Sequence, residues 1–362
     1  DPRSRAVGSR PQPTDNNEPR FTTAKADVSN LKMATCTSRL VHVASAALCI
    51  MQASTMSLSR HAVKGVPVSQ GDLVLMHIPY NAGHGTELVA MFPEWERDLV
   101  MPSVQKKIDK GNGQMDSVSG PFSSWPLVHL MTKPGGANWG HFDPDLAGIS
   151  DVTGCPMYFT PQKYWPQDLA KKYFGNKHIF GIIRDPYDRL VSFFRGDIQG
   201  YGGSYPEFHR NCDVNGAVKQ MLKNFIEGGD KFAQQCTFIP QVEYFEGPYK
   251  VEIPIDFRTF PSSLNTLMEE HHIYNMHVRA KDIPHVGTCP EVWGEDLDAE
   301  TRHLIQQVYK ADFDMLCKTF GYCDVDESTC MLEVPGMCPS KAFEWDDDAK
   351  IYRRKSTNAT AA

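Results

Sequence analysis

The central part of the chain alternates short apolar runs with stretches that have helical spacing of apolar positions. Residues 73–78 and 179–183 are apolar runs of strand length, and each is followed by a turn and an amphipathic stretch. Continuous apolar runs of this length are typical of strands buried on both faces of a parallel sheet. The alternation therefore predicts an α/β fold with a central parallel β-sheet flanked by helices.

The two flanking parts of the chain lack this pattern. Residues 1–65 show no clear periodicity, and the first twenty are rich in proline and charge, so we expect a disordered or targeting segment. Its apolar stretch, 40–51, is shorter than the roughly 20 residues of a membrane span, and it suits a poor signal-peptide core or a short helix equally well. We expect one domain over 66–323 and a cysteine-containing extension with a polar tail over 324–362.

The turn after the first apolar run consists mostly of small residues. Pro79 ends the strand because proline has no N–H to donate, and a helix is expected to start near Glu87. The residues between them are Tyr80, Asn81, Ala82, Gly83, His84, Gly85 and Thr86. Small residues allow the backbone to approach a ligand, and the N–H groups of a helix N-terminus attract phosphate or sulfate. A turn without any ligand explains the pattern equally well.

The second apolar run ends in an arginine that precedes a helix start. Arg184 stands at the carboxyl end of the expected strand, Asp185 is a good N-cap, and Pro186 suits the first helical position. Arg184 and the later Ser192 are suited to hold a phosphate by charge-assisted hydrogen bonds. Ligands of open α/β sheets bind at this end of the strands. The alternative interpretation of these residues, without any ligand, is an Arg–Asp ion pair on the surface beside a polar helix face.

Together these segments resemble the Golgi-type carbohydrate sulfotransferases, including heparan sulfate 2-O-sulfotransferase and the chondroitin and dermatan enzymes. The run from His77 to Glu87 is similar to the family loop for the 5′-phosphosulfate of 3′-phosphoadenosine 5′-phosphosulfate (PAPS). The run from Arg184 to Ser192 matches the 3′-phosphate motif Arg-Asp/Asn-Pro-x-x-Arg-x-x-Ser. Weaker similarities extend over residues 71–322. The resemblance implies a P-loop-like sulfotransferase fold, PAPS as co-substrate, no metal, and a glycan or another hydroxylated acceptor.

The resemblance also implies a location in the Golgi lumen or membrane, with any membrane anchor N-terminal to the given residues; the cytoplasm is the alternative. Ten cysteines, four of them at positions 317, 323, 330 and 338, indicate one or two disulfides in an oxidising compartment or, alternatively, thiols in a cytosolic enzyme. The net charge of −7 disfavours a nucleic-acid partner. The oligomeric state stays open.

Two residues are candidates for the base that takes the proton of the acceptor hydroxyl. Glu87 matches the glutamate of the family loop and lies on the first helical turn, where a carboxylate also interacts favourably with the helix dipole. His141 resembles the histidine of a Gly-His segment that serves as base in the 2-O-sulfotransferase branch. Either residue type can be a base near neutral pH, so both candidates stay open.

Tyr80 stands where the family has a loop lysine that neutralises charge on the bridging oxygen. Loss of such a preorganised charge costs about 3 kcal/mol or more in the barrier. A protonated His84 or a cation from elsewhere, such as Lys133, would compensate. Without compensation, the chain is a non-catalytic nucleotide-binding protein of the same fold. A further alternative is an enzyme whose acceptor is a small hydroxylated or amino metabolite.

Overall fold

The computed structural model describes residues 72–110, 137–196, 206–229, 231–283 and 289–356. All of these belong to one compact unit, residues 65–362. The expected disordered or targeting segment and Lys133 lie outside the described residues. Within the described ranges, no helix has the length and apolar character needed to cross a bilayer.

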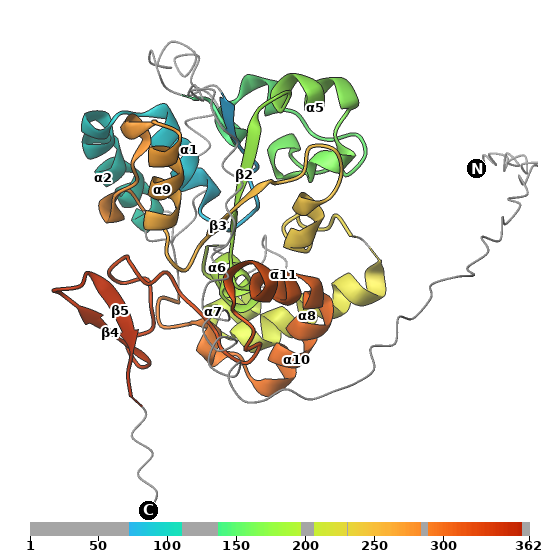
Figure 1. Ribbon diagram of the computed structural model, residues 1–362. Helices are drawn as coiled ribbons and strands as arrows, with labels where there is room; N and C mark the ends of the chain where they lie inside the picture. Colours follow the sequence, from blue (N-terminus) through green and yellow to red (C-terminus); the bar gives the residue numbers. More distant parts are fainter. Residues whose placement is uncertain (1–71, 111–136, 197–205, 230, 284–288, 357–362) are drawn as a thin grey trace, which may run out of the picture. The chain divides into compact units, whose positions relative to one another are not determined.

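Three parallel strands form the central sheet in the order β1-β2-β3 (Figure 1). The strands are β1 (Leu73–Leu75), β2 (His178–Ile183) and β3 (Ile253–Asp256). The parallel pairing confirms the predicted sheet. β3 escaped prediction because it contains Pro254, which is tolerated since β3 lies at the edge of this sheet.

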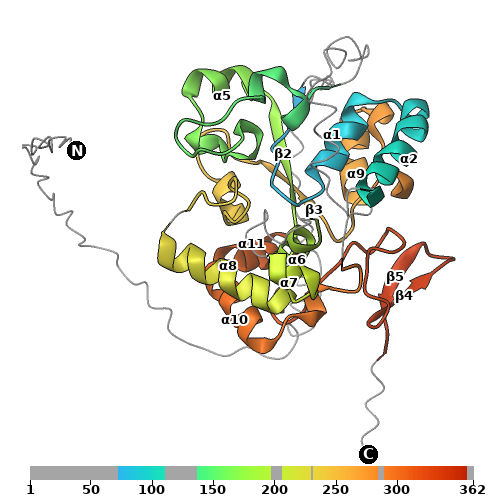
Figure 2. The ribbon, with the colours of Figure 1, turned by 180° about the vertical axis from the view of Figure 1, so that it is seen from behind.

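Helices lie on both sides of this sheet. In two opposite views, α1 (Gly83–Met91), α2 (Glu94–Lys110) and α9 (Ser262–Glu270) lie on one side, and α5 (Gln167–Tyr173) lies on the other (Figures 1 and 2). The core around the sheet is apolar and includes Val74, Phe174 and Phe180. This arrangement is the α/β architecture that the alternating pattern predicts.

A second group of helices gathers beyond the carboxyl end of β2 (Figures 1 and 2). Its members are α6 (Pro186–Gly196), α7 (Pro206–Arg210), α8 (Val214–Gly228), α10 (Ala299–Val308) and α11 (Lys310–Phe320). They share a separate core that includes Tyr187, Phe194, Val218 and Ile305. Residues at the ends of the strands therefore lie between two packed bodies of side chains.

Four disulfides join the cysteines of the described residues. Two of them, Cys317–Cys323 and Cys330–Cys338, use the four late cysteines and confirm the expected disulfides. The other two, Cys155–Cys236 and Cys212–Cys289, join residues 81 and 77 positions apart and were not predicted. Four such bonds indicate an oxidising compartment of the secretory type.

The C-terminal residues fold back onto the main body. Met331 and Val334 are buried in the core around the sheet, and Leu332 donates its N–H to the carbonyl of Arg258. The chain then forms an antiparallel hairpin of β4 (Phe343–Asp346) and β5 (Ile351–Arg354). The described part of the extension therefore contributes side chains to the core.

Candidate functional site

The two segments that the sequence singles out line one cavity of about 270 Å³. After β1, the cavity is lined by His77 and by the loop and helix start at Tyr80, Ala82, Gly83, His84 and Gly85. After β2, it is lined by Arg184, which follows the strand, and by Ser192, Phe193, Arg195 and Gly196 of α6. Asn81 and Thr86 are buried and are not among the lining residues. The predicted 5′ and 3′ segments thus line one cavity.

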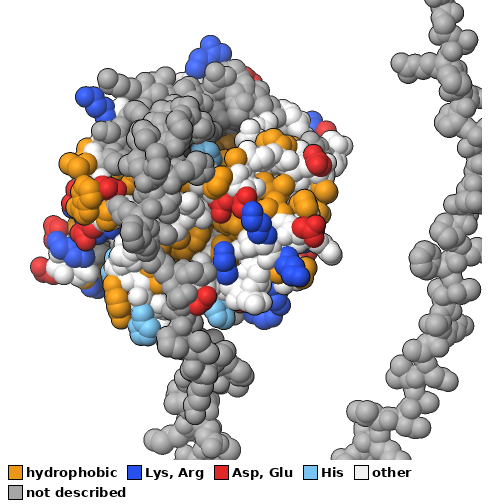
Figure 3. Space-filling model, turned by 90° about the horizontal axis from the view of Figure 1, so that it is seen from above, with side chains coloured by type: hydrophobic (Ala, Val, Ile, Leu, Met, Phe, Trp, Pro, Cys, Tyr) orange, Lys and Arg blue, Asp and Glu red, His pale blue; other side chains and the backbone are white. Residues whose placement is uncertain are grey.

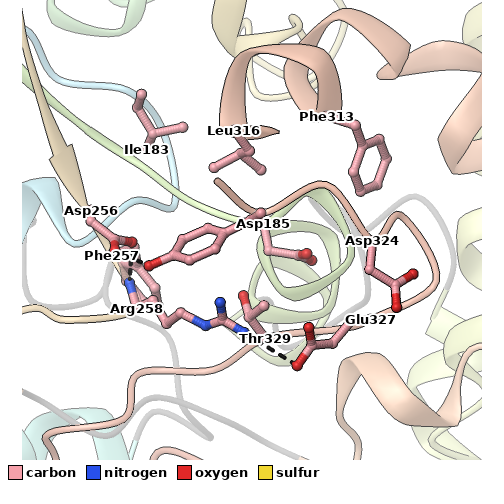
Figure 4. A pocket seen from close by; sticks show the side chains of 11 residues that line it. Ile183, Asp185, Asp256, Phe257, Arg258, Phe313, Leu316, Asp324, Glu327 and Thr329 are labelled. Atoms are coloured by element: carbon pink, nitrogen blue, oxygen red, sulfur yellow. Dashed lines mark hydrogen bonds and ion pairs between the residues drawn. The ribbon is translucent and has the colours of Figure 1, made fainter. Parts of the chain in front are cut away.

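A second pocket lies beside the ends of β2 and β3, and Phe257 lines both this pocket and the larger cavity (Figure 4). Its wall carries Asp185, Asp256 and Asp324, and Arg258 there is bonded to Glu327. Its volume of about 10 Å³ is that of a single water molecule. This pocket is too small and too acidic for a nucleotide, so the larger cavity is the candidate site.

Asn81 fixes the loop to the sheet. Its side-chain amide donates to the carbonyl of Ile182 at 2.7 Å and to Oε1 of Gln241 at 2.5 Å. On either side of it, Tyr80 and Ala82 have left-handed backbone angles, with φ of 63° and 60°. Such angles cost about 1 kcal/mol or more for a residue other than glycine. The buried amide contacts of Asn81 therefore hold the loop in a conformation that the chain alone disfavours.

Tyr80 points its ring at α6. The ring centroid lies 4.4 Å from that of Phe193, and the ring edge lies close to Gly196. The phenol therefore packs on the helix that carries Ser192 and Arg195. Tyr80 lines the cavity, but its phenol does not carry the positive charge of the lysine that the resembled family has at this position.

Glu87 is the centre of a hydrogen-bonded group. It lies in the second turn of α1, because this helix begins at Gly83 and not near Glu87 as predicted, so the expected place on the first turn is wrong. Glu87 is completely buried, and its Oε1 lies 2.5 Å from Nδ1 of His77 and 3.0 Å from the backbone nitrogen of His141. Its Oε2 lies 3.1 Å from Nδ1 of His84. Burial acts to raise the pKa of Glu87, but the charge and hydrogen bond of His77 and the hydrogen bond of His84 outweigh it, and the pKa falls to about 2. The carboxylate is therefore ionised and accepts from all three donors.

This ionised carboxylate determines which nitrogens of the two histidines carry hydrogen. A carboxylate only accepts, so Nδ1 is the donor in both His77 and His84. Burial lowers the pKa of His77 more than the charge and hydrogen bond of Glu87 raise it, and Nδ1 of His77 donates to Glu87 whether the ring is neutral or protonated. The ring of His84 is one-quarter exposed and lines the cavity. Glu87 thus orients an imidazole that faces the candidate site.

Two glycines make this close packing possible. A Cβ on Gly140, which has a φ of 52°, would lie 1.7 Å from Oε1 of Glu87. A Cβ on Gly83 would lie 2.3 Å from Nε2 of His77. Only glycine therefore permits the loop before His141 and the start of α1 to approach the buried group.

His77, His84 and Glu87 offer three ligand atoms within 4.8 Å of one another and could in principle hold a metal ion. Ligand atoms around tetrahedral zinc, with bonds of about 2.0–2.1 Å, lie roughly 3.3 Å apart. The 2.5 Å between Nδ1 of His77 and Oε1 of Glu87 is instead a hydrogen-bond distance. We therefore interpret the group as hydrogen-bonded.

His141 lies beside this group but is not among the described cavity-lining residues. Its ring is half-buried, 5.9 Å from the ring of His84 and 5.2 Å from that of Tyr158. The histidine is placed through its backbone N–H, which donates to Glu87. The two candidate bases from the sequence are thus neighbours, with Glu87 inside and His141 nearer to the surface.

Arg184 connects the loop to α6. Its Nε donates to Oδ2 of Asp188 at 2.7 Å, its Nη1 donates to the carbonyl of Tyr80 at 2.8 Å, and the guanidinium stacks 4.1 Å from the ring centroid of Phe257. Arg189, the second arginine of the motif, is buried and donates to backbone carbonyls, including that of Pro79. Arg184 therefore lines the cavity, whereas Arg189 supports the loop from behind.

The charged side chains of the cavity wall are basic. Its described lining residues include Arg184, Arg195 and two histidines, and none of them is an aspartate or glutamate. On the face seen from above, acidic and basic side chains of the described residues are interspersed (Figure 3). The positive character therefore belongs to the cavity and favours an anionic ligand.

Sequence reasoning missed several lining residues. Arg195 lies three positions after Ser192, which is a helical spacing that could have been noticed, whereas Trp293 had no signal. The segment Gln234–Cys236 has three successive left-handed residues, with φ between 52° and 66°, and Gln234 and Gln235 line the cavity. Its attachment through the Cys155–Cys236 disulfide could not be read from the sequence.

Comparisons with known proteins give no family assignment: no family model, no curated protein and no solved structure matches the chain.

Proposed function

We propose that this protein is a PAPS-dependent sulfotransferase with a P-loop-like sulfotransferase fold. The observation that carries the proposal is the cavity, because it joins the small-residue loop at the start of α1 to Arg184 and Ser192 and has basic lining side chains. A ligand with anionic groups at both ends of an adenosine fits such a wall. In this proposal, the loop binds the 5′-phosphosulfate, and Arg184 with Ser192 binds the 3′-phosphate.

The reaction is an in-line displacement at sulfur. A bond forms between the acceptor oxygen and sulfur while the bond from sulfur to the bridging phosphate oxygen breaks, and the acceptor proton passes to a base. Glu87 is completely buried and already accepts three hydrogen bonds. We therefore propose that Glu87 positions the imidazoles, and that His141 or His84 takes the proton.

The acceptor is proposed to be a glycan hydroxyl, and the location is proposed to be the Golgi lumen or membrane. The four disulfides support a compartment of the secretory pathway, and an oxidising lumen is where such bonds persist. A small hydroxylated or amino metabolite is the alternative acceptor.

One observation favours a second candidate function. The Tyr80 ring packs on Phe193, so the loop places no lysine at the bridging oxygen. The second candidate is therefore a non-catalytic protein of the same fold, which would bind the nucleotide without transferring the sulfuryl group. Lys133, one candidate for the missing charge, lies outside the described residues.

The test is transfer of ³⁵S from labelled PAPS to a panel of glycan and small hydroxylated or amino acceptors. We expect labelled product with the wild-type protein, and its loss in Arg184→Ala and Glu87→Ala. Binding of adenosine 3′,5′-bisphosphate without transfer to any acceptor would favour the non-catalytic alternative. Absence of both binding and transfer would reject the proposal.

A further inference from the structure

A second guanidinium shares the cavity wall with Arg184. Arg195 lies in the last turn of α6, three residues after Ser192, and both side chains line the cavity. Residues three apart on a helix lie on the same face. Arg184, Ser192 and Arg195 therefore face one region of the cavity, although only the first two belong to the motif that the sequence singles out.

A buried aromatic ring positions the Arg195 guanidinium. The guanidinium carbon lies 4.4 Å from the ring centroid of Trp293, whose side chain is buried and also lines the cavity. The backbone nitrogen of Trp293 donates to Oδ2 of Asp296 at 2.8 Å, which fixes the start of this segment. Stacking on an indole restrains a guanidinium without neutralising its charge. The Arg195 guanidinium is thus held in the wall of the cavity.

The two arginines lie close enough for their charges to interact. Burial and the like charge of Arg184 lower the pKa of Arg195, whereas the charges of Asp188 and Glu291 raise it. The same Asp188 carboxylate already accepts from Nε of Arg184. The guanidiniums of Arg184 and Arg195 repel each other, and a dianion between them would relieve this repulsion.

Resting on the proposed function, we propose that Arg195 and Arg184 form a two-arginine clamp for the 3′-phosphate of the nucleotide, with the Ser192 hydroxyl as a third donor. The 3′ end is assigned because Arg195 shares α6 with Ser192, whereas the 5′ end belongs to the loop at the start of α1. A terminal phosphate monoester carries close to two negative charges at neutral pH, which matches two guanidiniums. Arg195 thereby selects nucleotides that carry a 3′-phosphate.

The test compares two nucleotides that differ only in this group. Isothermal titration calorimetry measures the affinity for adenosine 3′,5′-bisphosphate and for 5′-AMP in the wild-type protein and in Arg195→Ala. We expect the substitution to weaken bisphosphate binding by about 10- to 100-fold, as for loss of a hydrogen bond to a charged group, and to leave 5′-AMP binding nearly unchanged. Arg195→Lys should fall between the two, because lysine keeps the charge but not the planar fork.

Two further variants serve as controls. Arg195→Met keeps a long side chain on Trp293 and carries the test if the alanine variant does not fold. Arg258→Ala removes another arginine that stacks on an aromatic ring, 4.1 Å from the centroid of Tyr322, but that lines only the small acidic pocket. Its affinities should equal those of the wild-type protein.

Three outcomes decide against the clamp in different ways. Wild-type protein that binds the bisphosphate no more tightly than 5′-AMP would overturn the clamp and also the proposed function. A wild-type preference that persists in Arg195→Ala and Arg195→Met would overturn the clamp alone. An equal loss for both nucleotides would place Arg195 at the 5′ end or in folding, and would likewise refute the 3′ assignment.

Discussion

Replacing Glu87 by glutamine tests the buried hydrogen-bonded group without changing its shape. The ionised carboxylate accepts from His77, His84 and the backbone of His141. Glutamine keeps one oxygen but puts an NH₂ group where the other oxygen accepts, so two donors would face each other. A buried polar group left without a partner costs about 1–3 kcal/mol.

The pKa of Glu87 gives an independent magnitude for the same change. A pKa lowered from 4.5 to about 2 corresponds to about 3 kcal/mol in favour of the ionised form in the folded protein. We therefore expect Glu87→Gln to lower the free energy of unfolding by about 3 kcal/mol at pH 7.5, measured by urea unfolding with tryptophan fluorescence. Glu246→Gln is the matched control: Glu246 is exposed and pairs with Lys163, and its loss should cost less than about 1 kcal/mol.

The same variant changes how stability depends on pH. Because the folded-state pKa of Glu87 lies below its ordinary value, its contribution is complete above about pH 4.5 and is lost as the pH falls toward 2. His77, whose pKa burial lowers below 6.5, adds a loss in the same direction as the pH falls below 6.5. In the wild-type protein stability should thus fall on acidification, and Glu87→Gln should remove the part between pH 4.5 and 2. If Glu87→Gln lowers the free energy of unfolding by less than about 1 kcal/mol at pH 7.5 and leaves its pH dependence unchanged, this reasoning is refuted.

Three further predictions follow from the same structure. Gly83→Ala should destabilise the protein by about 1–3 kcal/mol in thermal unfolding, because the added Cβ would lie 2.3 Å from a nitrogen of the buried His77 ring. Gly85→Ala is the control: the space at its Cβ is open, so this variant should be neutral or slightly stabilised. Burial raises the pKa of Asp185 to about 7, so the stability of the fold should decrease as the pH rises from about 4 to 7. Asp185→Asn keeps an N-cap residue and should raise the melting temperature at pH 8. A lower melting temperature of this variant at pH 8 would contradict the prediction. Replacing Cys155 and Cys236 by alanine should cost about 2–4 kcal/mol and weaken nucleotide binding measured by calorimetry, and unchanged binding would separate this disulfide from the cavity.

Local patterns were sufficient to predict the elements that obey simple rules. Apolar runs marked β1 and β2, and the Asp185-Pro186 pair marked the start of α6. The edge strand β3 escaped because its four residues include Pro254, which reads as a strand breaker. The two long-range disulfides escaped because cysteine spacing does not determine pairing between distant segments.

The candidate site was predictable in its ends but not in its interior. Arg184 and the loop stood out because chemistry and turn geometry coincide in a few consecutive residues. The burial of Glu87 depends on Gly140, 53 positions away, whose backbone closes over the carboxylate. The position of Arg195 depends on Trp293 in the same way. Such tertiary neighbours decide whether a carboxylate is a base or a support, and a single sequence carries no signal of them.

The most direct test of the central claim is a crystal structure of the protein with adenosine 3′,5′-bisphosphate bound. We expect the 3′-phosphate between the guanidiniums of Arg184 and Arg195 and within hydrogen-bond distance of Ser192, and the 5′-phosphate at the backbone N–H groups around Gly83. Electron density for the nucleotide outside this cavity, or with its two phosphates exchanged, would contradict the proposed binding site.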